Sequence, residues 1–279
     1  MSIVELDIRP LSGALGAEIF GVDVASDLSE KLVAELRAAL VEHLVIFFRD
    51  QSLSEAQHLT FADRFGEVIE YPMVKGLEAY PKIIPVIKLE HERVNFGGLW
   101  HSDMAYTKAP PMGSILVARE LPPYGGDTLF ANMYMAYDAL SVGMKDMLEG
   151  MCAVNSSAKA DVSATREDRM KTDAKVGEDH ESVGVHPVIR THPESGRKLI
   201  YLNPAHTVRF ENMTQEESEP LLNYLYAHQT RPEFTCRFSW RPGSIAFWDN
   251  RAAQHNPIND YHGHKRVMHR VTLAGDKPV

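Results

Sequence analysis

The segment Trp100-His101-Ser102-Asp103 combines two side chains that can bind a divalent metal ion. On a β-strand, residues two apart point to the same face, so His101 and Asp103 would face one atom while Ser102 points away. An imidazole nitrogen and a carboxylate oxygen together suit a first-row metal. The pattern alone has low specificity, because a polar surface strand produces the same pair by chance.

A third candidate ligand, His255, stands far downstream, in a segment that begins with Trp248-Asp249-Asn250. Two histidines and one carboxylate on one face of a metal form the facial triad of non-haem Fe(II) oxygenases, which leaves three positions open. The cosubstrate 2-oxoglutarate would take two of them and O2 the third. The chain has 13 histidines, so the surrounding segment rather than the residue type singles out His255.

Two arginines, Arg266 and Arg270, are four residues apart and would share one face of a strand. Two guanidinium groups on an inward face are costly unless anions meet them, and arginine pairs well with carboxylates. One arginine would hold the distal carboxylate of 2-oxoglutarate and the other an acidic group of the substrate. The alternative interpretation is a solvated edge strand with surface charge.

The elements that must position these residues are mostly strands. Capping residues Ser29, Ser54 (with Gln57) and Thr214 (with Glu217) predict three helices, the second of them ending at Gly66. Short helices are expected over residues 134–140 and 141–149. Strands are expected within residues 3–24 and over 44–48, 114–118, 128–130, 188–192, 198–201, 234–240, 244–248 and 267–273. This order predicts a mainly β protein with flanking helices, arranged as a double-sheet jelly roll.

The length of 279 residues and the apolar content of 44% are compatible with one domain over residues 1–279. Residues 156–185 interrupt the pattern, since they are rich in small and charged residues and lack apolar periodicity. Such an insertion is either a functional lid or a disordered loop. Two cysteines far apart, Cys152 and Cys236, indicate neither a zinc site nor a disulfide framework.

The charge balance is acidic, with 29 Lys and Arg against 38 Asp and Glu and a formal net charge of −9. Without a basic block, nucleic acid and anionic membranes are poor partners, whereas a small organic anion needs only a few local arginines. The sequence contains neither a signal peptide nor a membrane-length apolar run. We therefore expect a cytoplasmic protein.

These residues and their spacing resemble the family of taurine dioxygenase and 2,4-dichlorophenoxyacetate dioxygenase (TauD/TfdA). The resemblance rests on His101-x-Asp103, on His255, and on Arg266, which follows His255 by eleven residues. It extends over nearly the whole chain. Further matching segments are residues 11–19, 110–111, 122–128, 248–250, 269–270 and 275–278.

The resemblance implies a double-stranded β-helix, the cupin-like jelly roll, in which His101, Asp103 and His255 bind Fe(II). It also implies that the enzyme converts 2-oxoglutarate and O2 to succinate and CO2 while hydroxylating a small organic anion. When the hydroxylated carbon carries a heteroatom, a C–O or C–S bond then breaks. The family commonly forms dimers or tetramers, so a homo-oligomer is expected.

The resemblance further assigns Thr128, in the Gly-Gly-Asp-Thr segment, and Arg266 to the distal carboxylate of 2-oxoglutarate. Arg270 would face the anionic group of the substrate. The resemblance also makes residues 156–185 the natural lid of the site.

The substrate pocket departs from that of taurine dioxygenases. Their His-Pro-x-Tyr stretch is replaced by Tyr71-Pro72-Met73-Val74, and their Asn-rich stretch is replaced by residues 95–99. We expect the substrate to contact Tyr71, Met73, Val74, Asn95 and Phe96. This more apolar pocket favours an aryloxyalkanoate, an alkyl sulfate or an alkylsulfonate over taurine.

Two other interpretations stay open at this point. One is an oxygenase acting on a biosynthetic intermediate. The other is a cupin-like binding protein without catalytic activity, which the complete set of candidate ligands disfavours because such proteins usually lose a ligand.

Overall fold

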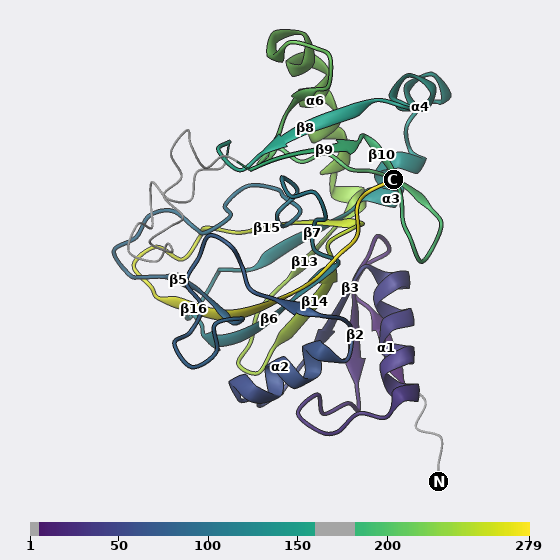
Figure 1. Ribbon diagram of the computed structural model, residues 1–279. Helices are drawn as coiled ribbons and strands as arrows, with labels where there is room; N and C mark the ends of the chain where they lie inside the picture. Colours follow the sequence, from purple (N-terminus) through teal and green to yellow (C-terminus); the bar gives the residue numbers. More distant parts are fainter. Residues whose placement is uncertain (1–5, 160–181) are drawn as a thin grey trace.

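The computed structural model describes residues 6–159 and 182–279 (Figure 1). Its strands are β1 (Asp7–Pro10), β2 (Ala17–Phe20), β3 (Val45–Phe48), β4 (Val68–Ile69), β5 (Ile84–Lys88), β6 (Gly113–Glu120), β7 (Thr128–Asn132), β8 (Cys152–Ser156), β9 (Val183–Pro187), β10 (Ile189–Thr191), β11 (Lys198–Ile200), β12 (Thr207–Phe210), β13 (Thr235–Phe238), β14 (Ile245–Asp249), β15 (Ala253–Pro257) and β16 (Arg266–Leu273). Its helices are α1 (Glu30–His43), α2 (Glu55–Asp63), α3 (Met133–Asp138), α4 (Val142–Leu148), α6 (Gln215–Gln229) and the 3-10 helix η3 (Pro232–Phe234).

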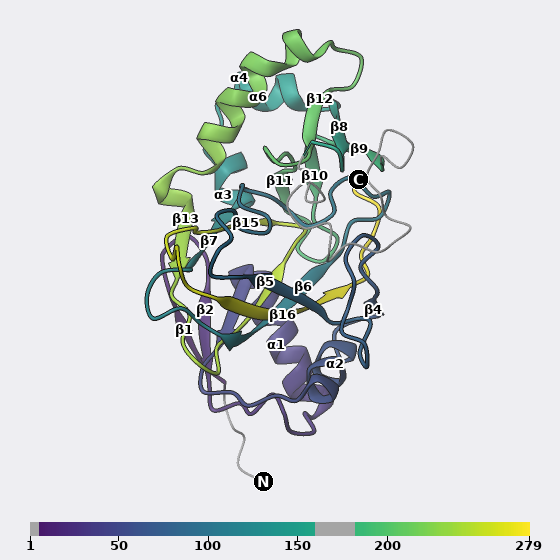
Figure 2. The same cartoon turned by 90° about the vertical axis from the view of Figure 1, so that its left-hand side faces the viewer.

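Half of the described strands belong to one large sheet with the order β1-β2-β3-β14-β6-β16-β4, in which β5 also pairs with β16. A second sheet, β13-β7-β15, faces it. Smaller sheets, β12-β8-β9 and β10-β11, lie with α4 and α6 at one end of the molecule (Figures 1 and 2). The predicted mainly β jelly roll with flanking helices is confirmed.

Aromatic side chains fill the space between the two facing sheets. The ring of Phe47 on β3 stacks on Phe238 of β13, with centroids 3.9 Å apart, and meets the edge of Phe130 on β7 at 5.7 Å. These side chains are fully buried. The strands alternate between this interior and an outer face, so residues that point inward near the strand ends reach the space between the sheets.

Helices α1 and α2 cover the outer face of the large sheet (Figure 1). Their predicted N-caps are confirmed: the Ser29 side chain accepts from the Leu32 amide, and Ser54 forms a capping box with Gln57. The predicted end of α2 at Gly66 is wrong, because the helix ends at Asp63. The next amides, of Arg64 and Phe65, bond to carbonyls three residues back, which tightens the last turn.

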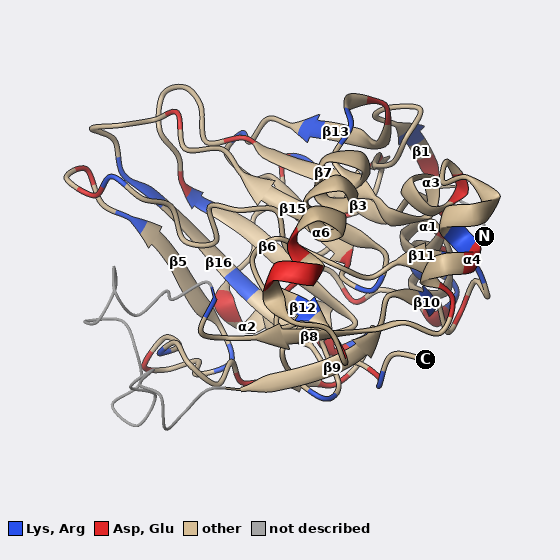
Figure 3. Cartoon of the chain, turned by 90° about the horizontal axis from the view of Figure 1, so that it is seen from above, with Lys and Arg blue, Asp and Glu red and all other residues tan. Residues whose placement is uncertain are grey.

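Helix α6 begins with the predicted capping box of Thr214 and Glu217. Glu216 and Glu217 stand in its first turn, where negative charge is favourable beside the positive end of the helix dipole. Figure 3 shows acidic residues on this helix in red. Within the described residues, no helix is long and apolar enough to cross a membrane.

The insertion predicted over residues 156–185 lies mostly outside the described residues. Its two described ends belong to an antiparallel pair, β8 with β9, in which Ser156 lies opposite Val183. Whether the remainder forms a lid stays a prediction.

One buried histidine of α2, His58, makes the stability of the fold depend on pH. Burial, followed by the nearby Arg119, lowers the pKa of His58 to about 3. Between pH 3 and 6.5 the unfolded chain therefore binds more protons than the folded chain, so the stability falls as the pH drops below 6.5.

We predict that His58 alone lowers the free energy of unfolding by about 1 kcal/mol for each pH unit below pH 6.5. Urea unfolding between pH 7 and pH 5 measures this slope. The His58→Leu variant should show a shallower slope, and the exposed-site control His262→Leu should match the wild type. An equal slope in His58→Leu and the wild type would contradict the assignment.

Candidate metal and cosubstrate site

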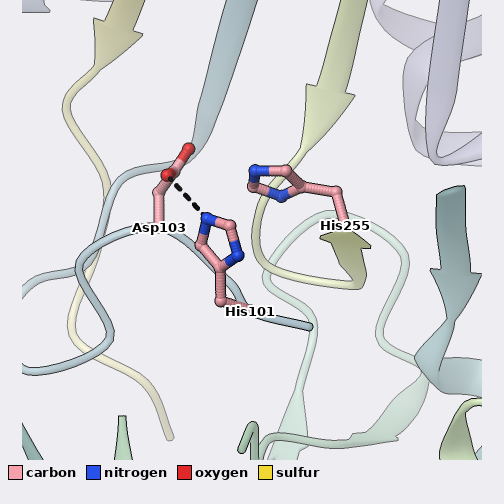
Figure 4. Close-up of side chains that lie close together, drawn as sticks. All are labelled: His101, Asp103 and His255. Atoms are coloured by element: carbon pink, nitrogen blue, oxygen red, sulfur yellow. Dashed lines mark ion pairs between the residues drawn. The ribbon is translucent and has the colours of Figure 1, made fainter. Parts of the chain in front are cut away.

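Two segments that are far apart in the sequence meet at an isolated antiparallel bridge between His101 and His255. The amide of each residue donates to the carbonyl of the other, at 3.0 and 2.9 Å. The prediction that His101 and Asp103 share a strand is wrong, since Asp103 lies in a turn after this bridge. The three predicted ligands nevertheless converge (Figure 4).

The side chain of Asn250 holds the turn that carries Asp103. Its amide oxygen accepts from the Asp103 amide at 2.6 Å, and its amide nitrogen donates to the carbonyls of Asp103 and Pro111. Asn250 follows β14 and is fully buried. The large sheet thus fixes Asp103 through a side-chain amide rather than through a strand.

One ligand atom from each of His101, Asp103 and His255 lies within 4.8 Å of the others, and all three residues are buried. The Nδ1 of His101 donates to the Leu99 carbonyl at 2.7 Å, which leaves Nε2 free to bind a metal. The ring of His255 packs against Trp248, with centroids 4.7 Å apart. At Gly97, whose φ is +69°, a Cβ would lie 2.8 Å from the His101 ring, so a side chain there would displace this ligand.

The surroundings of these three side chains keep each of them in the protonation state that binds a metal ion. Burial lowers the pKa of both His101 and His255, so the rings are neutral at pH 7. Burial alone would raise the pKa of Asp103, but Arg270, the two histidines and Ser114 together hold it well below its usual value. Two neutral imidazoles and one carboxylate are the donor set of a facial triad, so these residues fit a divalent metal such as Fe(II).

The predicted cosubstrate residues lie together in a cavity beside the triad. Thr128 and Arg266 line it, along with His101 and His255. Trp240 donates from Nε1 to the Thr128 hydroxyl at 3.0 Å, and its ring lies 5.7 Å from the Arg266 guanidinium.

Gly126, at φ +71°, gives Arg266 room, since a Cβ there would lie 3.2 Å from Cδ of the arginine. Burial lowers the pKa of Arg266, and within the described chain its Nε and Nη2 have no hydrogen-bond partner. Nε and Nη2 of this buried arginine can therefore donate to an anion in the cavity.

Arg270 lies on the same buried face of β16 as Arg266, as predicted. Its Nη1 donates to Oδ1 of Asp103 at 2.7 Å. The sequence did not reveal this contact with a candidate metal ligand. Its guanidinium carbon lies 4.9 Å from the Tyr71 ring centre and 5.8 Å from that of Phe96. Among the residues that the structure covers, Nε and Nη2 of Arg270 have no partner.

A second cavity of about 320 Å3 adjoins the first, since Asn95, Phe96 and His101 line both. Tyr71 and Met73 also line it, as predicted. Val74 is instead packed behind the cavity, in a small cluster with Ile84 and Met104.

The side chain of Asn95 is engaged in the wall between the cavities. It donates to the Pro257 carbonyl and accepts from the Tyr261 hydroxyl. Asn95 therefore holds this wall in place as well as lining it.

Several side chains at the site were not predicted. His206 and Tyr106 line the second cavity, where their rings meet edge to face at 5.0 Å. Lys88 lines the first, and Trp240 supports it. The sequence shows Lys88 only as a lysine at the end of an apolar run. Its place in the cavity follows from the pairing of β5 with the distant strand β16, which no local pattern reveals.

The chain is similar to one known family of dioxygenases and to individual members of it. The family described as "Taurine catabolism dioxygenase TauD, TfdA family" matches residues 7–272. The chain is 36% identical over 284 residues to an alpha-ketoglutarate-dependent sulfate ester dioxygenase of Pseudomonas putida, covering 99% of this chain and 92% of that protein. It is also 36% identical to an alkylsulfatase of Acinetobacter baylyi, covering 98% and 86%.

Among solved structures, a taurine dioxygenase from Burkholderia xenovorans superimposes with a TM-score of 0.83 at 36% identity. The alignment covers 98% of this chain and 92% of that chain.

We predict that Asn250→Ala weakens binding of a divalent metal by about ten- to a hundredfold, because the Asp103 turn loses its support. The affinity of the metal-free protein for Mn(II) or Fe(II), measured without oxygen, tests this. The variant Asn223→Ala, at an exposed position of α6, is the control and should bind as the wild type does. Unchanged affinity in Asn250→Ala would show that the turn holds Asp103 without the amide.

Proposed function

Because this chain belongs to the taurine catabolism dioxygenase TauD, TfdA family, we propose that it is an Fe(II)- and 2-oxoglutarate-dependent dioxygenase that cleaves alkyl sulfate esters. The convergence of His101, Asp103 and His255, all buried and beside two cavities, carries this proposal. Bound Fe(II) supplies the O2 activation that couples decarboxylation of 2-oxoglutarate to hydroxylation of a C–H bond. The protein's own residues position the reactants and exclude water.

Thr128 and Arg266 would hold the distal carboxylate of 2-oxoglutarate. The Thr128 oxygen already accepts a hydrogen bond from Trp240, so its own O–H is left to donate to the carboxylate. Arg266 offers Nε and Nη2 from the same cavity. A hydroxyl and a guanidinium facing one carboxylate form charge-assisted bonds that fix the cosubstrate in one orientation.

Arg270 would serve two groups at once. Its Nη1 holds the Asp103 carboxylate, and its remaining donors can receive an anionic group of the substrate. The rings of Tyr71 and Phe96 flank the guanidinium, at the border of the second cavity. The sulfate end of the substrate would therefore lie beside the metal, and its carbon chain would extend away from it.

The walls of the second cavity suit a hydrophobic substrate body. Apolar side chains dominate among the lining residues, including Met73, Leu99 and Met104. The two curated relatives at 36% identity are named for sulfate esters, which favours this substrate class over sulfonates. Hydroxylation of the carbon that bears the ester oxygen gives an unstable product, which collapses to an aldehyde and hydrogen sulfate.

The predicted homo-oligomer and cytoplasmic location stay predictions. The alternative of an oxygenase on a biosynthetic intermediate differs from this proposal in substrate alone, so the same assay separates the two.

We predict that the iron-loaded protein forms succinate and inorganic sulfate in equal amounts when given 2-oxoglutarate, air and hexyl, octyl or decyl sulfate. Taurine, hexanesulfonate and 2,4-dichlorophenoxyacetate complete the panel, and His101→Ala is the inactive control. Succinate formed only with the aryloxyacetate would move the proposal to that class. Slow succinate formation that no anion accelerates would favour the biosynthetic alternative, and no succinate at all would overturn the proposal.

A further inference from the structure

Two tyrosine hydroxyls meet in the wall of the second cavity. The hydroxyl oxygens of Tyr71 and Tyr106 lie 3.4 Å apart, and both side chains line the cavity. Tyr106 is 4% exposed, and its ring meets that of His206 edge to face at 5.0 Å. This packing fixes the direction of the Tyr106 ring, so its hydroxyl has a defined place at the substrate cavity.

Neither contact of the Tyr106 hydroxyl is a strong hydrogen bond. The distance to the Tyr71 oxygen exceeds the usual range of about 2.5–3.0 Å for two hydroxyls. Tyr71 can donate across it, which leaves the Tyr106 proton with the sulfur of Met73 at 3.7 Å, and a thioether is a weak acceptor. A buried donor without a strong acceptor is unfavourable, so an oxygen of a ligand at this place would stabilise it.

Arg270 lies next to this pair of hydroxyls, with its guanidinium carbon 4.9 Å from the Tyr71 ring centre. Asp103 accepts from Nη1 of the arginine, whereas Nε and Nη2 have no partner in the part of the chain that the structure describes. The N–H bonds of Nε and Nη2 are parallel, so this edge of the guanidinium can bind two oxygens of one anion.

The shape of the anion decides how many donors it needs. A carboxylate has two oxygens in one plane, and the free edge of Arg270 can bind both. A sulfate ester has three terminal oxygens, arranged as a tetrahedron around sulfur. When Arg270 binds two of them, the third is left for a donor in the neighbouring wall, where the Tyr106 hydroxyl lacks a strong acceptor.

We propose that the Tyr106 hydroxyl donates to the third terminal oxygen of the sulfate ester, and that the site therefore prefers tetrahedral oxyanions to carboxylates. This inference rests on the proposed function, since it concerns the substrate of the same site. The oxygen of the anion replaces the Met73 sulfur as the acceptor of the Tyr106 proton. Arg270 then provides the charge, and Tyr106 distinguishes the shape of the anion.

The test compares octyl sulfate with decanoate, an anion of similar length whose head group is a carboxylate. Their Kd values are measured by calorimetry on Mn(II)-loaded protein with 2-oxoglutarate and without oxygen. The variant Tyr106→Phe removes the hydroxyl and keeps the ring that packs on His206. The control Tyr224→Phe makes the same change at an exposed position of α6.

We expect Tyr106→Phe to raise the Kd of octyl sulfate about ten- to a hundredfold, as for a lost hydrogen bond to a charged group, and to leave that of decanoate unchanged. Its melting temperature should equal or exceed that of the wild type, because a poorly bonded buried hydroxyl is gone. Tyr224→Phe should leave all of these values unchanged. Should Tyr106→Phe fail to fold, Tyr106→Leu is expected to show the same loss for octyl sulfate alone.

An equal effect on both anions, or no effect on either, would overturn the assignment of Tyr106. A lowered melting temperature with unchanged Kd values would identify the hydroxyl as purely structural.

Sulfate release from octyl sulfate by the iron-loaded wild type in air separates this test from that of the proposed function. If sulfate is released but Tyr106→Phe binds octyl sulfate normally, the assignment of Tyr106 alone fails. If the variant loses affinity for octyl sulfate but the wild type releases no sulfate, the contact is upheld and the proposed function fails. A wild type that binds neither anion and releases no sulfate would overturn both.

Discussion

The ion pair between Asp103 and Arg270 links the candidate metal ligands to the arginine that would receive the anion of the substrate. A carboxylate that is 2% exposed would be very unfavourable without partners. Arg270 from β16, the Ser114 hydroxyl from β6 and the Asn250 amide after β14 surround this residue and its backbone. The burial of the carboxylate at this place therefore depends on the correct register of the large sheet.

Under the proposed function the same register would arrange the reactants. Along β16, one inward face presents Arg266 and then Arg270, so one strand would recognise both the distal end of the cosubstrate and the anion of the substrate. The bridge between His101 and His255 brings together two of the three residues that would hold the metal. The shared face of the two arginines follows from the alternation of side chains on a strand. In the loops, glycine allows close approaches, as at Gly97 beside the His101 ring.

Local patterns in the sequence predicted the elements and the residue types of the site well. The caps at Ser29, Ser54 and Thr214 depend on neighbouring residues alone, and the shared face of Arg266 and Arg270 follows from a spacing of four. The turn at Asp103 depends on Asn250, which is remote in the sequence, and the position of Lys88 beside Arg266 depends on strand pairing. Such contacts arise from tertiary register, which no local pattern encodes.

The central claim is that His101, Asp103 and His255 bind one metal and leave adjacent positions open for 2-oxoglutarate. The most direct measurement is the visible absorption of the protein with Fe(II) and 2-oxoglutarate in the absence of oxygen. The account predicts a metal-to-ligand charge-transfer band in the wild type and in the exposed-site control His262→Ala, and none in His255→Ala. A wild type without the band, or a band of equal intensity in His255→Ala, would contradict it.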